Sequence, residues 1–156
     1  MNSRSSDPAG EPLSLPVDAP GASPTRRVLV VDDSQDARSI LKLLLTKLGH
    51  DARTAEDGHT GIAIFKVFQP EIVLCDLMMA GGMSGYAFAK AARAEGALEG
   101  VCMIAVSGLE GPDYEHQAYA AGFDRLMKKP LGLSELQAIL KSPPRRTDCG
   151  NGENTN

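Results

Sequence analysis

The chain has 156 residues, of which 42% are hydrophobic and 23% charged, and its formal net charge is −4. This composition is typical of a soluble protein with one domain and some additional chain, because single domains most often contain ~100 to 150 residues. The mildly acidic balance argues against general binding to nucleic acid or to an anionic membrane surface.

The cysteines and histidines indicate neither a disulfide framework nor a metal site. Cys75 and Cys102 lie in apolar runs and Cys149 lies in a polar stretch, and this odd number favours reduced thiols and the cytosol. The histidines are scattered, which predicts surface or loop positions for all of them: His50, His59 and His116. No apolar run is long enough for a signal peptide or a membrane span, so we expect a cytoplasmic protein without membrane contact.

The first part of the chain predicts a leader, a strand and a helix. Residues 1–25 are rich in Ser, Pro, Gly and Asp and predict a disordered leader. The aliphatic run VLVV at 28–31 predicts a strand that is buried on both faces. Ser34 is suited to cap the following helix, whose apolar residues recur at spacings of three and four, and Gly49 is suited to end it.

The rest of the chain alternates between short β-branched runs and longer helical stretches. Residues 51–55 predict a weaker edge strand, and Pro70 ends the helix that follows it. The remaining strands are predicted at 71–75, 101–106 and 123–127, with helices through Tyr86 to Ala92, at Tyr114 to Ala121 and at 133–140. Residues 142–156 are polar and contain adjacent prolines and arginines, which predicts a disordered tail and leaves residues 26–141 as the single domain.

This alternation predicts an α/β fold with a parallel sheet, because parallel strands need helical crossovers and those crossovers are right-handed. We expect a flavodoxin-like doubly wound (βα)5 sandwich with a five-stranded sheet of order 2-1-3-4-5. In such a sheet ligands bind outside the carboxyl ends of the strands, at the switch point between strands one and three.

The polar residues follow the predicted strands at those carboxyl ends. Asp32 and Asp33 follow the first strand, Asp76 the third, Ser107 the fourth and Lys129 the fifth. Adjacent carboxylates repel each other and lose solvation near an apolar core, so they need open water or a cation. Carboxylates gathered with open positions suit Mg²⁺, and Lys129 can offset the third carboxylate or an incoming phosphoryl oxygen.

Four motifs in this order resemble the receiver domain of bacterial two-component response regulators: VLVVDDSQ, IVLCDLMM, AVSG and KKP. The resemblance covers residues 27 to about 141. It implies that Asp76 accepts a phosphoryl group from the phosphohistidine of a histidine kinase or a histidine phosphotransfer protein. It also implies that Ser107 hydrogen-bonds the phosphoryl group and that Lys129 pairs with it.

The resemblance further implies a Mg²⁺ site. Asp33 would be a direct ligand, Asp32 would assist it through water, and Asp76 and the backbone carbonyl of Met78 would complete the protein ligands. Taken singly, these residues have ordinary structural interpretations, such as a turn for Ser107. Their joint placement at one rim of the sheet outweighs those interpretations.

The chain departs from the family pattern in the loop and at the switch position. Most receivers have proline where Ala80 stands, and AGGMSG carries an extra glycine before Gly85. This predicts a looser loop after Asp76 and a less regular metal coordination through Met78. Leu126 stands where the fifth strand usually carries the aromatic switch residue. Met78 and Leu109 flank the expected path of the hydrolytic water and are bulky and apolar, so we expect slow loss of the phosphoryl group.

We therefore expect a single-domain response regulator that works as a phosphorelay switch and not as an enzyme. Its output would be a protein contact, through the face of helix four, strand five and helix five, with an unidentified downstream protein and no nucleic acid. One alternative is a phosphorylation-independent receiver-like scaffold. An aspartyl-phosphate hydrolase would need a second acid where Met78 stands, and a flavin- or nucleotide-binding domain would not place acids after its first strand.

Overall fold

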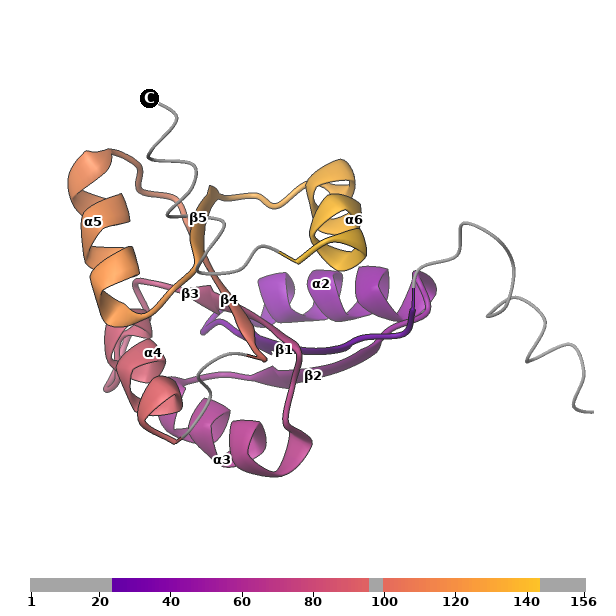
Figure 1. Cartoon of the computed structure of the whole chain (residues 1–156), viewed down its shortest axis with the longest axis horizontal. Coiled ribbons are helices and arrows are strands. Elements are labelled where there is room, and N and C mark those ends of the chain that lie inside the picture. Colours follow the sequence, from indigo (N-terminus) through magenta and orange to yellow (C-terminus); the bar gives the residue numbers. More distant parts are fainter. Residues whose placement is uncertain (1–23, 96–99, 144–156) are drawn as a thin grey trace, which may run out of the picture.

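Five parallel strands form one sheet in the predicted order, β2-β1-β3-β4-β5 (Figure 1). The structure is a computed structural model that describes residues 24–95 and 100–143. The strands are β1 (Arg27–Val31), β2 (Asp51–Ala55), β3 (Ile72–Asp76), β4 (Cys102–Ser107) and β5 (Arg125–Lys128). The helices are α2 (Gln35–Lys47), α3 (Gly58–Phe68), α4 (Gly85–Ala94), α5 (Pro112–Ala121) and α6 (Leu133–Lys141).

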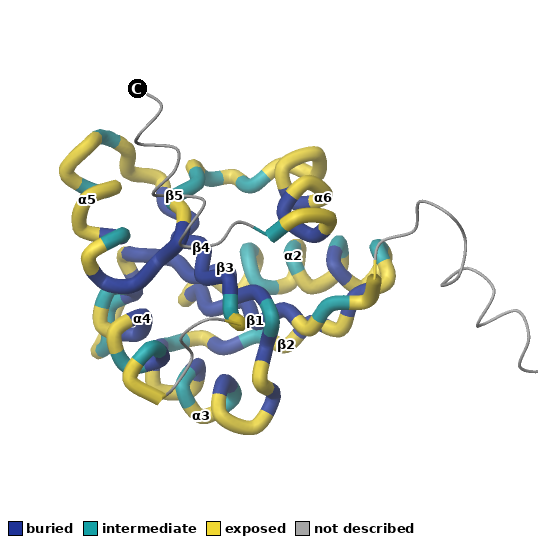
Figure 2. Tube along the Cα trace, in the orientation of Figure 1, coloured by how far each residue is buried: buried dark blue, intermediate teal, exposed yellow. Residues whose placement is uncertain are grey.

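The helices cover both faces of the sheet, so the fold is the doubly wound α/β sandwich that the sequence predicts (Figures 1 and 2). On one face α2 and α6 contribute Leu45, Leu136 and Ile139 to a buried cluster with the sheet. On the other face α3, α4 and α5 contribute Phe65, Phe88 and Ala118 to a second cluster.

Short polar side chains start three of the helices. Ser34 accepts a hydrogen bond from the N–H of Ala37, as expected of a capping residue. Asp57 and Ser84 do the same for α3 and α4. At the other end of α2, Gly49 has φ 92°, a left-handed conformation that glycine adopts without strain.

The predicted fifth strand was placed too early. β5 begins at Arg125, because Ile104 of β4 pairs with that residue, and Phe123 and Asp124 precede the strand. Phe123 looked like a strand residue because it is apolar, but its ring packs in the buried cluster beneath α4 and α5. The structure also shifts β3 and β4 one residue later than predicted, so that they end at Asp76 and Ser107.

A surface or loop position was predicted for His50, and the structure confirms a loop position but not an exposed one. His50 lies in the loop between α2 and β2 but is only 8% exposed. Its Nδ1 accepts a hydrogen bond from the backbone N–H of Arg26 at 3.0 Å. The side chain of Arg26 in turn donates to the carbonyls of Leu140 and Lys141 at the end of α6. The backbone of Arg26, which is 24 positions away in the chain, therefore lies against the histidine ring.

The described residues leave parts of the predicted organisation untested. The expected leader and tail fall almost entirely in residues 1–23 and 144–156, which lie outside the described residues, as does Cys149. Cys75 and Cys102 are both buried, in β3 and β4. None of the helices that the structure describes is long and apolar enough to cross a membrane.

Candidate functional site

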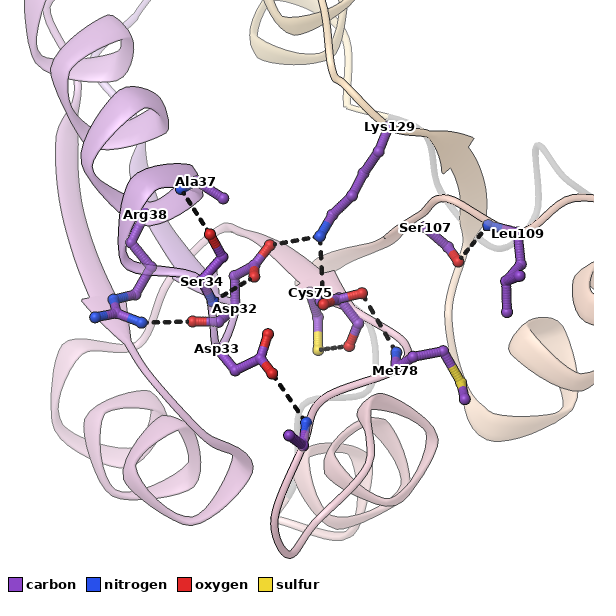
Figure 3. Close-up of polar contacts among 12 residues, drawn as sticks. Asp32, Asp33, Ser34, Ala37, Arg38, Cys75, Met78, Ser107, Leu109 and Lys129 are labelled. Carbon is purple, nitrogen blue, oxygen red and sulfur yellow. Dashed lines mark hydrogen bonds and ion pairs between the residues drawn. The ribbon is translucent and has the colours of Figure 1, made fainter.

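The register of the sheet brings the predicted site residues to one edge. Val31 of β1 lies beside Cys75 of β3, so Asp32, the next residue of one strand, comes beside Asp76, the next of the other. Asp76 in turn pairs with Val106, which precedes Ser107. Figure 3 shows Asp32, Ser107 and Lys129 around the end of the sheet. The parallel arrangement therefore converts positions far apart in the chain into one cluster.

Lys129 connects two carboxylates of the cluster. Its Nζ lies 3.0 Å from Asp32 Oδ2 and 3.3 Å from Asp76 Oδ2 (Figure 3). Both carboxylates are almost fully buried, whereas 31% of the lysine side chain is exposed. Burial lowers the pKa of Lys129, but the hydrogen bond to Asp32 and the charge of Asp76 outweigh it, so the net shift is upward. The ammonium group is therefore firmly charged.

Asp76 stands in an environment that disfavours its charged form. Burial raises the pKa of its carboxyl group above the ordinary value, the Lys129 ammonium acts against this, and the Asp32 carboxylate adds to it. A single lysine thus leaves the pair of carboxylates short of positive charge. An additional cation at this edge would reverse the balance and favour the ionised group.

Each carboxylate of the cluster also accepts one backbone N–H. Asp32 Oδ1 accepts from Ser34 at 2.9 Å, and Asp76 Oδ1 accepts from Met78 at 3.3 Å. Asp33 Oδ2 accepts from Ala80 at 2.9 Å. These bonds fix the orientation of the carboxylates and leave further oxygen lone pairs for other partners.

The donor set fits a hard divalent cation. Asp32, Asp33 and Asp76 each offer one carboxylate oxygen, and these oxygens lie within 4.8 Å of one another. Oxygen ligands from carboxylates, with room for water molecules, are what Mg²⁺ prefers. The N–H of Met78 contacts Asp76, so the Met78 backbone lies at the cluster. Its carbonyl as a metal ligand remains a prediction.

Ser107 is buried at the end of β4, and only 1% of the residue is exposed. Its hydroxyl oxygen accepts a hydrogen bond from the N–H of Leu109 at 3.0 Å, so the side chain closes a local turn. The hydroxyl hydrogen is not used by this bond. The serine can therefore still donate to an acceptor that arrives at the edge of the sheet.

The two residues predicted to flank the water path lie at the rim. Met78 is 59% exposed and Leu109 is 37% exposed. Figure 3 shows the Met78 side chain extending to the side on which Ser107 and Leu109 lie. Leu126, at the altered switch position, is partly buried and packs against the cluster beneath α4 and α5.

Sequence reasoning missed the residues that support the site through backbone groups. Arg38 donates a hydrogen bond to the carbonyl oxygen of Asp32 at 2.9 Å and so anchors the residue before Asp33. The N–H of Ala80 reaches Asp33 from the other side of the loop. Arg38 lies four residues after Ser34 on α2, a spacing that points it back toward the strand end. The contact from Ala80 uses its backbone N–H, so the identity of the side chain gives no indication of it.

Gly85 is required by the close approach of α4 to the end of β3. A Cβ atom at this position would collide with the carbonyl oxygen of Asp76 and approach Leu77 Cα within 2.7 Å. The N–H of Gly85 donates to the carbonyl of Leu77 at 3.0 Å. The glycine-rich loop is therefore held against Asp76 and Leu77 at the point where it leads into α4.

Comparison with known proteins identifies the family. The model of the response regulator receiver domain matches residues 28–141, which is most of the chain. The chain belongs to the response regulator receiver family. The matched residues include the three carboxylates of the cluster, and they include every strand except the first residue of β1.

Curated relatives of the receiver include proteins of different length. The probable transcriptional regulator ycf27 of Porphyridium aerugineum is 32% identical over 128 residues, which are 82% of this chain and 52% of that protein. Protein PilG of Pseudomonas aeruginosa is 29% identical over 116 residues, which are 74% of this chain and 85% of PilG. The chain thus spans about half the length of the ycf27 relatives that it matches.

Solved structures of other receivers share the fold. The chemotaxis protein CheY4 of Vibrio cholerae superposes with a TM-score of 0.70 at 25% identity, over 74% of this chain and 96% of CheY4. A CheY-like receiver domain from Methylobacillus flagellatus has a TM-score of 0.65 at 29% identity, over 76% of this chain and 98% of that domain. The likeness extends over about three quarters of this chain.

Proposed function

We propose that this receiver domain accepts a phosphoryl group on Asp76 from a phosphohistidine, with Mg²⁺ bound by Asp32, Asp33 and Asp76. The observation that carries the proposal is the bridge that Lys129 makes between Asp32 and Asp76, at 3.0 and 3.3 Å, beside the exposed carboxylate of Asp33. This edge gathers a carboxylate nucleophile, a set of metal ligands and the ammonium group of Lys129. Together these groups suit phosphoryl transfer.

The transfer uses the carboxylate of Asp76 as nucleophile. One of its oxygens attacks phosphorus, a P–O bond forms, and the P–N bond to the donor imidazole breaks with its electron pair returning to nitrogen. Bound Mg²⁺ would neutralise charge on the transferring phosphoryl oxygens. Lys129 is already 3.3 Å from Asp76 and can pair with the new phosphoryl group, to which the Ser107 hydroxyl can donate.

We propose further that the phosphorylated domain acts through protein contacts and not as an enzyme, with a histidine kinase or histidine phosphotransfer protein as phosphoryl donor. Ser107 and Lys129 lie at the ends of β4 and β5, so a new bond to either can shift the neighbouring α5 and α6. PilG, which is mostly covered by this chain, supports the single-domain form.

A second candidate function is the receiver part of a longer transcriptional regulator. The ycf27 relatives carry that name, and the chain spans about half of their length. In both candidates the phosphoryl chemistry at Asp76 is the same. They differ in whether phosphorylation changes contacts with another protein or with an attached domain.

The test is phosphorylation in vitro with a radiolabelled small-molecule donor, acetyl phosphate, in the presence of Mg²⁺. We expect the wild type to take up acid-stable, hydroxylamine-labile label, and Asp76→Asn to take up none while it keeps its fold by circular dichroism. Asp36→Asn, an exposed carboxylate in the first turn of α2, is the matched control and should be labelled normally. Labelling of Asp76→Asn at the wild-type rate would overturn the assignment.

The same experiment separates the alternatives that the sequence left open. A phosphorylation-independent scaffold would bind neither phosphoryl donor nor beryllofluoride, the stable mimic of a phosphoryl group. A hydrolase would release inorganic phosphate over many turnovers without retaining label. Stoichiometric, retained label supports the switch.

A further inference from the structure

The three carboxylates of the site are not compensated in the same way. Asp32 and Asp76 each pair with Lys129 and accept a backbone N–H as well. Asp33 is exposed, and the contact that orients its carboxylate is the N–H of Ala80, 2.9 Å from Oδ2. These residues are 47 positions apart in the chain, so the bond joins the start of α2 to the loop after β3.

The loop is shaped so that this N–H reaches Asp33. Gly81 and Gly82 follow Ala80 with φ values of 67° and 100°, which side-chain-bearing residues rarely adopt. Ser84 then accepts from Ala87 to start α4, and the N–H of Gly85 bonds to the carbonyl of Leu77. The loop is anchored at its exit, and its reversal through the two glycines leaves the N–H of Ala80 directed at the carboxylate.

We propose that the backbone N–H of Ala80 is a positioning group for the metal site. It holds Asp33 by Oδ2, and the lone pairs of the other carboxylate oxygen are not used by this bond. This inference rests on the proposed function, since it concerns the Mg²⁺ that the site would hold. Hydrogen bonds to a ligating carboxylate fix its orientation, and their loss typically weakens metal binding ~10- to 100-fold.

Proline at position 80 would abolish this contact because proline has no N–H. The chain therefore uses an interaction that is impossible for a receiver with proline at this position. A substitution that brings the loop closer to the common family pattern is expected to damage the metal site. The extra glycine of the loop is then part of the same arrangement, because it provides one of the left-handed residues after Ala80.

The experiment is a calorimetric titration of the unphosphorylated chain with MgCl₂. We expect Ala80→Pro to raise the Kd for Mg²⁺ about tenfold, whereas Ala80→Ser, which keeps the N–H, leaves it within about twofold. In an Asp33→Ala background, Ala80→Pro should have no further effect, because its partner is already gone. An equal loss in both backgrounds would mean that proline distorts the loop in general, and it would overturn the inference.

Amide hydrogen exchange gives a second readout that does not depend on Ala80→Pro being folded. The N–H of Ala80 should exchange slowly in the wild type and at least tenfold faster in Asp33→Ala. An exchange rate that Asp33→Ala leaves unchanged would overturn the inference. The result also separates the two proposals: a wild type that binds no Mg²⁺ overturns the proposed function, whereas equal Kd values for wild type and Ala80→Pro overturn only the role of Ala80.

Discussion

Buried carboxylates are compensated differently at the two ends of the sheet. At the amino end, Asp124 is 1% exposed and its Oδ2 accepts from Arg93 at 3.0 Å and from the N–H of Met103 at 2.8 Å. Arg93 also donates to the carbonyls of Gly122 and Val101. The carboxylate therefore has its own guanidinium group, and that group is held by the surrounding backbone.

At the carboxyl end, three carboxylates gather around one ammonium group. Lys129 pairs with Asp32 and Asp76, and Asp33 lies beside them with its oxygen within 4.8 Å of theirs. Burial raises the pKa of Asp76, so the fold places this group where its charge is costly. The buried carboxylate at the amino end is therefore compensated within the protein, whereas the carboxyl end keeps excess negative charge that a bound cation can compensate.

The largest expected effect is at the amino end. Arg93→Met removes the guanidinium group beside the buried Asp124 carboxylate and its bonds to two carbonyls, so we expect a loss of about 3 kcal/mol or more in the free energy of unfolding. Urea denaturation measures it. Lys66→Met is the control, because the Lys66 to Glu95 ion pair is exposed and should contribute at most about 0.5 kcal/mol. Equal losses in the two variants would contradict the comparison.

At the carboxyl end, the apolar rim should slow the loss of the phosphoryl group. Met78→Asn with Leu109→Glu introduces side chains that can orient a water molecule, and we expect dephosphorylation about tenfold faster, or roughly 1.4 kcal/mol in the barrier. Decay of the label after removal of the donor measures the rate. Met78→Leu with Leu109→Met keeps the rim apolar and should decay as the wild type does. A polar double variant with an unchanged lifetime would show that the rim does not limit water entry.

Neutralising the acceptor should stabilise the metal-free domain by a smaller amount. The pKa of Asp76 is raised in the folded state, so between the ordinary carboxyl value and the raised one the folded chain binds more protons than the unfolded chain. Stability is therefore lost as the pH rises through this window, and at neutral pH the charge of Asp76 is a net cost. We expect Asp76→Asn to melt at a higher temperature than the wild type in EDTA at neutral pH, with the difference shrinking in acid. A lower melting temperature would contradict this account.

The smallest effect concerns His50 at the amino end. Burial lowers the pKa of His50, the charge of Arg26 lowers it further, and the charge of Glu71 raises it. The folded chain therefore binds the proton at a lower pH than the unfolded chain, which binds it near pH 6.5. Stability should fall as the pH drops below about 6.5. His50→Gln keeps an acceptor for the N–H of Arg26 and should flatten the melting temperature between about pH 5.5 and 7.5. His116→Gln, an exposed position on α5, should leave the slope unchanged.

Much of the fold and the main site residues follow from local patterns in the sequence. Buried aliphatic runs alternate with helical periodicity, which is enough to predict parallel strands joined by helices. Asp32, Asp76 and Ser107 come at the ends of such runs, and parallel strands bring their carboxyl ends to one edge. The site could be predicted because each of its side chains is placed by the strand that carries it.

The tertiary structure alone decided the contacts that depend on packing between distant segments. Arg93 and Asp124 are 31 residues apart, Arg26 and His50 are 24 apart, and none of these residues has a local pattern that distinguishes it from a surface residue. The start of β5 depended on its register with β4, and the bond from Ala80 to Asp33 depended on the path of a glycine-rich loop. Such hydrogen bonds form only where the folded chain brings a donor and an acceptor from distant positions within bonding distance. Short-range periodicity in the sequence does not indicate which distant residues come close.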